Sequence, residues 1–242
     1  MYHTVVIGGG CLGAASAISL QKKLNKAGKK DKVCLVEKAV LCAAESSRHS
    51  GIVRSANADP DASMMASLST KMWKNLSETW GLEMELDEFG AIWIAKKNSD
   101  GENPVWSELS ERMKKIDLTF QEIDSKSAIE KCGKTLLTDE NESYFYEPAA
   151  FQLDPSILRS TLYNALDQNG VDLLEKTEVD TILTKGNQIL GITTNNGKID
   201  AKNFVNATGA WSSQLFSKIG LKIPVTIEPV SVVNWMESPK QI

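Results

Sequence analysis

The sequence has few of the residues that build metal sites or disulfide frameworks. Its 242 residues include four cysteines and two histidines, and no two cysteines form a Cys-x-x-Cys pair. A structural zinc site therefore has poor support. Cys11 and Cys34 fall in segments that we expect to be buried, so a reducing, cytoplasmic location is predicted. The first strand is expected to begin at Thr4, which leaves no room for a signal peptide.

The chain also lacks long apolar runs and an excess of charge. No apolar run approaches the roughly 20 residues that a membrane-spanning helix needs, so no membrane span is expected. A net charge of −4 provides no broad cationic surface, which argues against nucleic acid or an anionic membrane as the principal partner. With 42% hydrophobic and 24% charged residues, the composition is that of an ordinary globular protein with one domain or two small ones.

A glycine-rich turn follows the first predicted strand. It matches the pattern Gly-x-Gly-x-x-Gly at Gly8, Gly10 and Gly13. The first glycine permits a tight turn, the second lets a pyrophosphate approach the backbone, and the third lets the next helix pack closely. Free N–H groups at the start of that helix, near Cys11 and Leu12, would bind the diphosphate. The pattern predicts a dinucleotide site without separating NAD from FAD.

The second predicted strand ends on an acid, as in other dinucleotide-binding folds. Glu37 lies 24 residues after Gly13, close to the typical spacing of about 20, and its carboxylate can accept hydrogen bonds from both ribose hydroxyls. No third strand and helix follow directly, as they would in an NAD-binding Rossmann domain. A polar loop over residues 42–54 follows instead, which leaves an NAD-dependent enzyme as the residual alternative.

About ninety residues of mixed helix and strand separate this start from the second half of the chain. Apolar residues at helical spacing predict one helix over 61–80. Its core-facing stripe would consist of Met65, Leu68, Met72, Leu76 and Trp80. Other predicted strands are 89–95, 143–146, 172–175, 178–184, 188–194 and 203–207, and other predicted helices are 105–115, 125–131 and 154–168. Trp93, Tyr144 and Tyr146 are interpreted either as core or as the lining of a substrate cavity.

Four segments carry a family resemblance. They are 5–13 with Glu37 and Lys38, 46–54, 153–155 with 170–171 and 178–179, and 206–211. In order and spacing they resemble the D-amino-acid-oxidase-like FAD-dependent oxidoreductases, and within these the sarcosine oxidase and glycine oxidase branch. The resemblance implies an α/β fold, with a Rossmann-like FAD-binding domain of the glutathione-reductase type 2 and an inserted α+β substrate domain. The FAD-binding domain would occupy 1–58 and 148–215, and the substrate domain 59–147 and 216–242.

The resemblance also implies which residues contact FAD. In the family, the loop after the second strand runs beneath the pyrophosphate and the flavin ring, a later valine presents its backbone to the adenine, and an Ala-Thr-Gly turn approaches the cofactor. The cofactor-binding residues implied in this way are Gly8, Gly10, Cys11, Leu12, Gly13, Glu37, Lys38, Ser46, Ser47, Arg48, His49, Ser50, Gly51, Val179, Ala207, Thr208, Gly209 and Trp211.

Arg54 falls where sarcosine-oxidase-like members hold the substrate carboxylate with an arginine, so the resemblance implies a catalytic-site role for it. A guanidinium suits that task because its planar fork pairs a carboxylate bidentately. A structural ion pair and a phosphate contact are the alternatives. His49 lies two residues beyond the position at which some relatives carry covalent flavin, so a polar loop residue is favoured over flavin attachment or base catalysis.

The resemblance implies an FAD-dependent oxidoreductase that oxidises a small amine or amino acid by hydride transfer to flavin N5, with oxygen or another compound as electron acceptor. A hydroxy-acid or glycerol-3-phosphate dehydrogenase on the same fold is one alternative. Family members run longer, and this sequence stops inside an expected early strand, 225–236, of the returning substrate domain. It is interpreted as a C-terminally truncated fragment or a flavin-binding subunit completed by a second chain, rather than a degenerate copy, because its motifs are intact.

Overall fold

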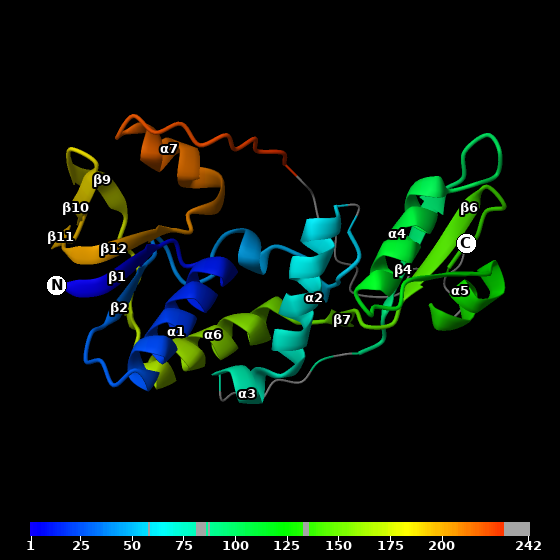
Figure 1. Ribbon diagram of the computed structural model, residues 1–242, viewed down its shortest axis with the longest axis horizontal. Helices are drawn as coiled ribbons and strands as arrows, with labels where there is room; N and C mark the ends of the chain where they lie inside the picture. The colour runs from blue at the N-terminus through cyan, green and yellow to red at the C-terminus, as the bar shows by residue number, and fades with distance from the viewer. Residues whose placement is uncertain (58, 81–85, 87, 133–135, 230–242) are drawn as a thin grey trace. The chain divides into compact units, whose positions relative to one another are not determined.

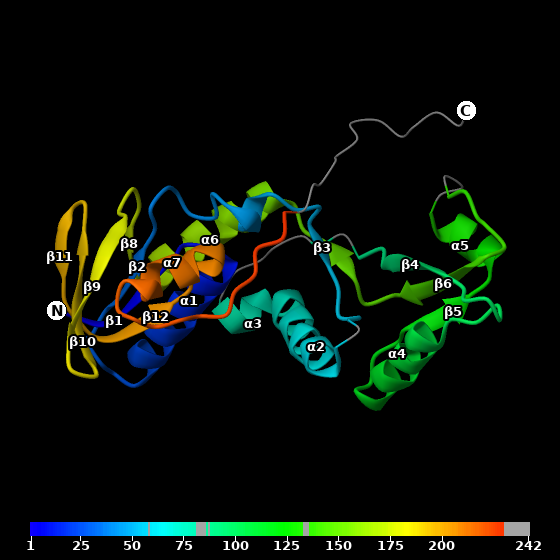
Figure 2. The same cartoon turned by 90° about the horizontal axis from the view of Figure 1, so that it is seen from above.

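The computed structural model of the protein describes residues 1–57, 59–80, 86, 88–132 and 136–229. They form two compact units, whose elements Figures 1 and 2 show. Of the described residues, the first unit comprises Met1–His49 and Pro155–Pro229, and the second comprises those between Ser50 and Asp154. The predicted domain boundaries remain predictions. None of the helices in the described ranges combines the length and the apolar character that crossing a bilayer requires.

A four-stranded parallel sheet with strand order β12-β1-β2-β8 lies at the centre of the first unit. Its strands are β1 (Tyr2–Ile7), β2 (Val33–Val36), β8 (Asp172–Leu174) and β12 (Ala201–Asn206). β2 is apolar and buried throughout, as strands of parallel sheets covered on both faces are. The helices α1 (Cys11–Lys26) and α6 (Pro155–Asn169) pack against each other, side by side in Figures 1 and 2. The predicted α/β fold with a Rossmann-like start is confirmed.

The register of this sheet brings three strand ends to the same level. Ile7 at the end of β1 lies opposite Val36 on one side and Asn206 on the other. Backbone hydrogen bonds continue past the strands: the Gly8 N–H donates to the Val36 carbonyl at 2.8 Å, and the Ala207 N–H donates to the Ile7 carbonyl at 2.8 Å. The segments that follow β1, β2 and β12 therefore share one carboxyl edge, where α/β sheets bind ligands.

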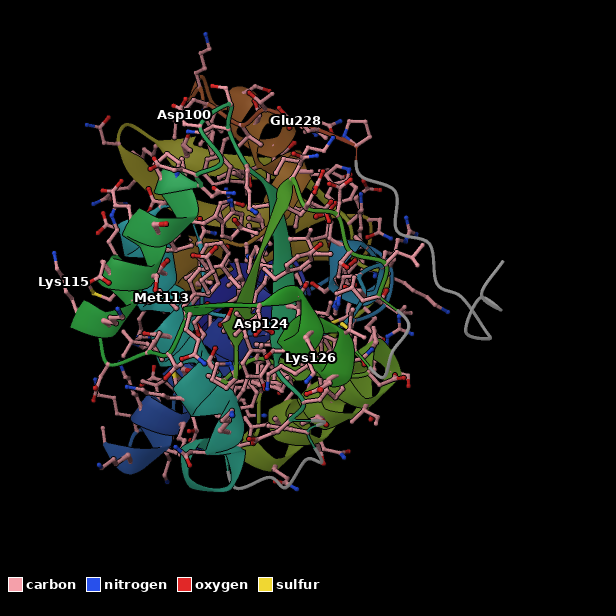
Figure 3. All side chains as sticks on the ribbon, turned by 90° about the vertical axis from the view of Figure 1, so that its right-hand side faces the viewer. Asp100, Met113, Lys115, Asp124, Lys126 and Glu228 are labelled. Carbon is pink, nitrogen blue, oxygen red and sulfur yellow. The ribbon has the colours of Figure 1, made fainter. Side chains whose placement is uncertain are left out.

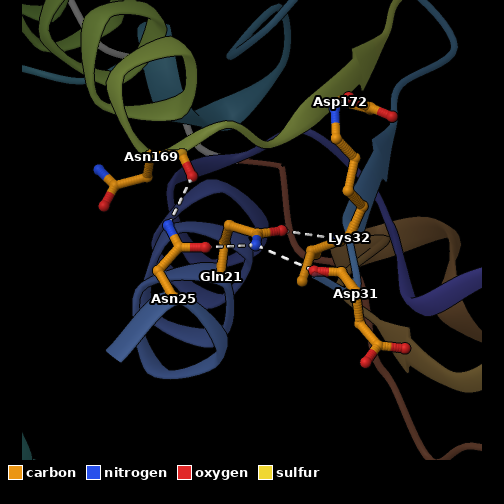
Figure 4. Close-up of polar contacts among 7 residues, drawn as sticks. Gln21, Asn25, Asp31, Lys32, Asn169 and Asp172 are labelled. Carbon is orange, nitrogen blue, oxygen red and sulfur yellow. Dashed lines mark hydrogen bonds and ion pairs between the residues drawn. The ribbon is translucent and has the colours of Figure 1, made fainter. Parts of the chain in front are cut away.

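The buried side chain of Gln21 and the exposed side chain of Asn25 join α1 to its neighbours in the first unit (Figure 4). The Gln21 Nε2 donates to Asn25 Oδ1 at 2.9 Å and to the Asp31 carbonyl at 3.2 Å, while its Oε1 accepts the Val33 N–H at 2.7 Å. The Asn25 Nδ2 in turn donates to the Asn169 carbonyl at 3.0 Å, at the end of α6. Every polar atom of the Gln21 amide thus has a partner, and the start of β2 is fixed against α1.

Smaller elements complete the first unit. A three-stranded antiparallel sheet has the order β11-β10-β9, and two 3-10 turns and a short helix follow the ends of strands. These elements are β9 (Val179–Lys185), β10 (Gln188–Thr194), β11 (Gly197–Ile199), η1 (Glu45–Ser47), η2 (Gly209–Trp211) and α7 (Ser212–Ser217). Ile182 of β9 and Ile192 of β10 are buried in one cluster with Val5 and Val36, so the small sheet extends the core of the parallel one.

The second unit is built on an antiparallel sheet with the order β4-β6-β5. Its elements are β3 (Ile52–Val53), α2 (Pro60–Lys74), α3 (Leu76–Trp80), β4 (Ala91–Lys96), α4 (Pro104–Lys115), β5 (Gln121–Ile123), α5 (Ser125–Lys131), β6 (Glu142–Glu147) and β7 (Phe151–Gln152). The rings of Phe120 and Phe145 stack at 5.4 Å in its core, which also buries Met113 of α4. Lys115, at the end of the same helix, extends outward in Figure 3.

The predicted single helix over 61–80 is wrong in two respects. It is divided into α2 and α3 at Asn75, and the α2 part of its apolar stripe faces outward, with Met65, Leu68 and Met72 exposed by 65%, 57% and 48%. The buried face of α2 carries the polar residues Ser63, Ser67 and Thr70 instead. All three hydroxyls have hydrogen-bond partners. The Ser63 hydroxyl donates to the Asn57 carbonyl, and the Ser67 hydroxyl donates to the Met64 carbonyl. The Thr70 hydroxyl donates to the Ala66 carbonyl and also bonds to the Ser55 hydroxyl. Satisfied hydroxyls can be buried at low cost, so periodicity alone selected the wrong face.

Other expectations require smaller corrections. Of the strand expected over 225–236, positions 225–229 are not in a strand, and the rest lies outside the described residues. Cys34 is buried as predicted, whereas Cys11 is only half-buried. Tyr144 is buried and bonds through its hydroxyl to Glu142, which makes it a core residue. The two-residue strands β3 and β7 were too short to produce a sequence pattern.

Candidate functional site

The glycine-rich loop is packed so tightly that side chains cannot be added at two of its positions. Gly8 has a positive φ of 107°, and a Cβ there would lie 2.4 Å from the Ala207 carbonyl oxygen. A Cβ on Gly13 would lie 1.9 Å from the Gly8 carbonyl oxygen. The loop after β1, the start of α1 and the bend after β12 are therefore in direct backbone contact, which only glycine permits.

The start of α1 presents backbone N–H groups, because the first turn of a helix lacks acceptors within the helix. One of them, the Cys11 N–H, donates to the Ser46 hydroxyl at 3.0 Å. Ser46 belongs to η1, in the loop that the sequence predicts to run beneath the pyrophosphate. A Cβ on Gly10 would lie 3.1 Å from the same hydroxyl, so this approach also depends on a missing side chain.

Glu37 follows β2 directly and is held by two backbone groups. Its Oε2 accepts the Gly9 N–H at 2.8 Å, and its Oε1 accepts the Ala39 N–H at 2.8 Å. A carboxylate offers about four acceptor sites, so each oxygen keeps a lone pair for a further donor. The next residue, Lys38, places its ammonium 3.7 Å from the ring centre of Trp211 in η2. This cation–π contact joins the end of β2 to the turn after β12.

These elements enclose one cavity of about 350 Å³ within the first unit, a volume in the range of small-molecule sites. The predicted residues that line it are Gly8, Gly10, Cys11, Leu12, Glu37, Lys38, Ser46, Val179, Ala207, Thr208, Gly209 and Trp211. Gly13 lies beneath the loop rather than in the lining. The glycine loop and the Ala-Thr-Gly bend thus face the same space, although about 200 residues separate them in the chain.

Sequence reasoning missed further residues of this cavity. Thr177, Gln214 and Lys218 also line it, the last two at and just after α7. Lys218 is tied to the small sheet, since its Nζ donates to the Asp180 carbonyl at 2.7 Å. The sequence signal for Gln214 and Lys218 was their position shortly after the Ala-Thr-Gly bend, and that for Thr177 was its place two residues before Val179. Cys42 was likewise not among the predicted site residues, although it lines the cavity together with Cys11.

The other predicted loop residues lie outside the cavity lining. In the first unit, the Ser47 hydroxyl donates to the Ala44 carbonyl at 3.3 Å, Arg48 follows the end of η1, and the His49 Nε2 is 3.1 Å from the Ser46 carbonyl. Ser50, Gly51 and Arg54 belong to the second unit. There the Leu153 N–H donates to the Gly51 carbonyl at 2.9 Å, and the Ser50 carbonyl accepts from Gln152 at 3.2 Å. The first contact, between backbone groups, extends the β3–β7 pair, and the second comes from the Gln152 side chain.

Arg54 is exposed and held in one orientation. Its guanidinium carbon lies 4.2 Å from the ring centre of Trp93, and its Nη1 donates to the Ala56 carbonyl at 2.8 Å. The neighbours of Arg54 are bonded to Glu147, a carboxylate that is 1% exposed. Glu147 Oε1 accepts the N–H groups of Ser55 at 2.5 Å and Ala56 at 3.2 Å, and its Oε2 accepts the Trp93 indole N–H at 3.2 Å. A buried acid therefore fixes both the backbone and the aromatic ring that surround Arg54.

The thiols at the cavity have unequal acidity. A hydrogen bond from the Cys42 thiol, followed by one from Ser46 and the charge of His49, lowers the pKa of Cys11 to about 6. The hydrogen bond to Cys11 and burial raise the pKa of Cys42 above its ordinary value. These opposite shifts favour the thiolate on Cys11 and the protonated thiol on Cys42. In the described residues, no three side chains of the metal-binding kinds gather in one place.

A parallel sheet whose carboxyl edge carries a glycine loop, a helix N-terminus and a terminal acid defines a dinucleotide-binding α/β protein. The residues fit FAD, because the loop lacks the side chains that would fill the cradle and Glu37 keeps acceptors for ribose hydroxyls. The family model described as FAD dependent oxidoreductase matches residues 3–241. The chain belongs to this family, whose cofactor is FAD, and the predicted resemblance, cofactor and enzyme class are confirmed.

Individual relatives are similar over most of this chain. It is 26% identical to the mitochondrial pyruvate dehydrogenase phosphatase regulatory subunit of Mus musculus over 88% of the chain and 23% of that protein. It is 22% identical to sarcosine oxidase subunit beta of Rhizobium meliloti over 93% of the chain and 53% of that protein. The crystal structure of L-proline dehydrogenase from P. horikoshii matches 94% of the chain and 58% of its own, with a TM-score of 0.80 and 26% identity. The chain thus spans about half, or less, of the length of these curated relatives.

Proposed function

We propose that the protein oxidises a small amine or amino acid of the sarcosine, glycine or D-amino-acid type. The observation that supports this best is the single cavity shared by the glycine loop, Glu37 and the bend at 207–209. Among the relatives, sarcosine oxidase and L-proline dehydrogenase are named for α-amino acids with a secondary amine nitrogen. Bound FAD would supply a hydride acceptor at N5 for the carbon beside the nitrogen; the substrate would leave as an imine that water hydrolyses, and oxygen or another compound would take the electrons.

Different residues of the cavity would contact different parts of the cofactor. The N–H groups at the start of α1 face the position proposed for the diphosphate, where the helix dipole favours negative charge. Glu37 would accept hydrogen bonds from the ribose hydroxyls through its remaining lone pairs. Val179 would present its backbone to the adenine, and the bend at Ala207 and Thr208 would approach the cofactor from the other side. Lys38 and Lys218 add positive charge to the cavity wall.

Arg54 is proposed to bind the carboxylate of the substrate. Its contact with Ala56 uses one of the five guanidinium N–H donors, so donors for a bidentate pair with a carboxylate are left. The Trp93 ring beneath the guanidinium removes part of its hydration and limits its rotation. An arginine held in this way loses little conformational entropy on binding, which favours the recognition of a planar anion.

A second candidate is a flavin-binding subunit that acts with another chain. It is favoured by the two curated relatives named as subunits, the phosphatase regulatory subunit and sarcosine oxidase subunit beta. A hydroxy-acid or glycerol-3-phosphate dehydrogenase is the alternative on the same fold, because the fold does not fix the substrate. We also propose a reducing, cytoplasmic location, which the free thiols of Cys11, Cys34 and Cys42 support.

The test begins with the visible spectrum of the purified chain after addition of FAD. A yellow, FAD-loaded protein is then mixed anaerobically with sarcosine, glycine, D-alanine or a hydroxy acid, and bleaching of the flavin absorbance at about 450 nm is followed. Bleaching by the amines, at a rate that rises with pH as the ammonium loses its proton, supports the proposal. Bleaching by the hydroxy acid alone would replace it with the second enzyme class.

Two variants separate cofactor binding from substrate binding. Arg54→Met is expected to retain the yellow colour and to raise the substrate concentration needed for half-maximal bleaching by about a hundredfold, the value of a lost charged hydrogen-bond pair. Arg112→Met, at an exposed position of α4, is the matched control and should behave as the unchanged protein. A yellow protein that no amine bleaches until a partner chain is added would support the second candidate, a flavin-binding subunit. A protein that never binds FAD would refute both the amine-oxidising function and the flavin-binding subunit.

A further inference from the structure

Two cysteines from different elements meet in the wall of the nucleotide cavity. Cys11 is the first residue of α1, and Cys42 lies in the loop after β2. The Cys42 N–H donates to the Gly9 carbonyl at 2.8 Å, which attaches that loop to the glycine turn. The two thiols are within hydrogen-bonding reach of each other, and both line the cavity. Neither has a role in the proposed oxidation of substrate.

The surroundings give the two thiols different chemical roles. Cys11 is half-buried, at the positive end of α1, and is further stabilised as a thiolate by the Ser46 hydroxyl and by His49. Cys42 is buried and stays protonated beside it. Its backbone has a positive φ of 58°, which is rare for a residue with a side chain and fixes the direction of that side chain. A partly exposed thiolate beside a buried thiol is the arrangement found in redox-active cysteine pairs.

We propose that Cys11 and Cys42 form an oxidant-sensitive pair that hydrogen peroxide converts to a disulfide when the cavity contains no FAD. The Cys11 thiolate attacks one peroxide oxygen, the O–O bond breaks, and sulfenic acid forms on Cys11 while the released hydroxide takes a proton to become water. The Cys42 sulfur then attacks the sulfenic sulfur, an S–S bond forms, and the second water leaves with the Cys42 proton. Two thiols lose two electrons, and one peroxide is reduced to two waters.

This pair also responds to the cofactor, a step that rests on the proposed function. The Cys11 N–H belongs to the helix start that faces the proposed diphosphate, so bound FAD would cover the Cys11 sulfur. The negative diphosphate would also oppose a thiolate at the same place. The FAD-free protein is therefore the form that peroxide oxidises, and the disulfide marks protein that has not taken up its cofactor.

The test uses the reduced full chain without FAD. It is treated with one equivalent of hydrogen peroxide, alkylated after denaturation, and analysed by mass spectrometry of its peptides. We expect a peptide pair linked between Cys11 and Cys42, lost on addition of dithiothreitol, while Cys34 and Cys132 stay alkylated. In Cys42→Ser, dimedone should trap a sulfenic acid on Cys11, and in Cys11→Ser neither product should form. Cys132→Ser is the matched control and should leave the linked peptide unchanged.

Several outcomes would overturn the proposal. One is oxidation of Cys11 no faster than of Cys132 in the same sample, and another is a disulfide that joins a different pair.

A separate experiment tests protection by the cofactor. FAD added before peroxide should slow formation of the linked peptide by about tenfold, because it covers the Cys11 sulfur and brings negative charge. If FAD binds, as its fluorescence shows, but does not protect, the diphosphate does not lie at α1 and that part of the proposed function fails while the pair stands. If the linked peptide never forms, the pair fails and FAD binding is unaffected.

Discussion

Replacing Glu147 by glutamine tests whether a buried acid organises the surroundings of Arg54. The glutamine side chain keeps the size and shape of glutamate but has one acceptor oxygen in place of two. In the native protein one carboxylate oxygen serves the N–H groups of Ser55 and Ala56, and the other serves the Trp93 indole N–H. In Glu147→Gln either the backbone pair or the indole must face an amide NH₂, which cannot accept.

The magnitude follows from the number of donors that lose their acceptor. Glu147→Gln leaves one buried donor unsatisfied and weakens the remaining bonds from charged to neutral, so we expect a loss of about 2 kcal/mol in the free energy of unfolding. Glu147→Ala leaves three donors and a cavity, and we expect a loss of about 4 kcal/mol. Removing the indole donor by Trp93→Phe relieves the conflict. Glu147→Gln should therefore cost about 1 kcal/mol less in that background, a coupling typical of residues in contact.

The assay is urea unfolding of the four proteins in the Glu147 and Trp93 cycle, followed by far-ultraviolet circular dichroism. Hydrogen exchange of the Ser55 and Ala56 amides provides a local readout, and exchange should accelerate in Glu147→Gln. Costs of the two changes that add to within about 0.3 kcal/mol would refute the reasoning, because independent sites add to that accuracy. In the FAD-loaded protein, Glu147→Gln should raise KM for a carboxylate substrate and leave kcat unchanged, as expected for a residue that positions Arg54.

Three further predictions concern the first unit. Gly13→Ala places a Cβ 1.9 Å from the Gly8 carbonyl oxygen and should weaken FAD binding by about a hundredfold in a fluorescence titration, with a stability loss of about 2 kcal/mol. Its control, Gly28→Ala, has a positive φ but open space and should cost about 1 kcal/mol without changing FAD affinity. Glu37→Gln should raise the Kd for FAD about tenfold, whereas Glu122→Gln, at an exposed position of β5, should not; equal effects would contradict the ribose assignment. Alkylation of Cys11 by iodoacetamide in FAD-free protein should rise with a midpoint near pH 6, because only the thiolate reacts and its pKa is about 6; a midpoint near an ordinary thiol's value of about 8.5 would refute this.

The parts of the fold that were predicted correctly have local causes. The turn at Gly8, the terminal acid Glu37 and the helix that begins at Pro155 each depend on a few neighbouring residues, so the sequence pattern and the structure agree. The α2 helix was predicted with its buried and exposed faces exchanged. Its hydroxyl residues are satisfied within the helix and by Ser55 and Asn57, contacts from outside the predicted helix that periodicity does not report.

The residues missed in the candidate site likewise depend on contacts between distant parts of the chain. Glu147 stands at the end of a strand, where an acid ordinarily faces water, and only the backbone N–H groups of Ser55 and Ala56, about ninety residues earlier, explain its burial. The approach of Cys42 to Cys11 depends on the path of a loop without regular structure. Contacts of this kind are set by tertiary packing, and no pattern in the intervening sequence encodes them.

The nearness of the two distant bends has a single geometric cause, the alignment of β1 with β12. Because Ile7 lies opposite Asn206, the chain leaves both strands at the same level, and Gly8 meets Ala207 directly. A shift of one residue in a parallel pair would displace the bend by about 3.3 Å and turn its side chains to the other face. The carbonyl of Ala207 would then no longer lie against Gly8, and a cavity shared by both bends could not form. The register of one strand pair thus determines whether the two motifs act as one site.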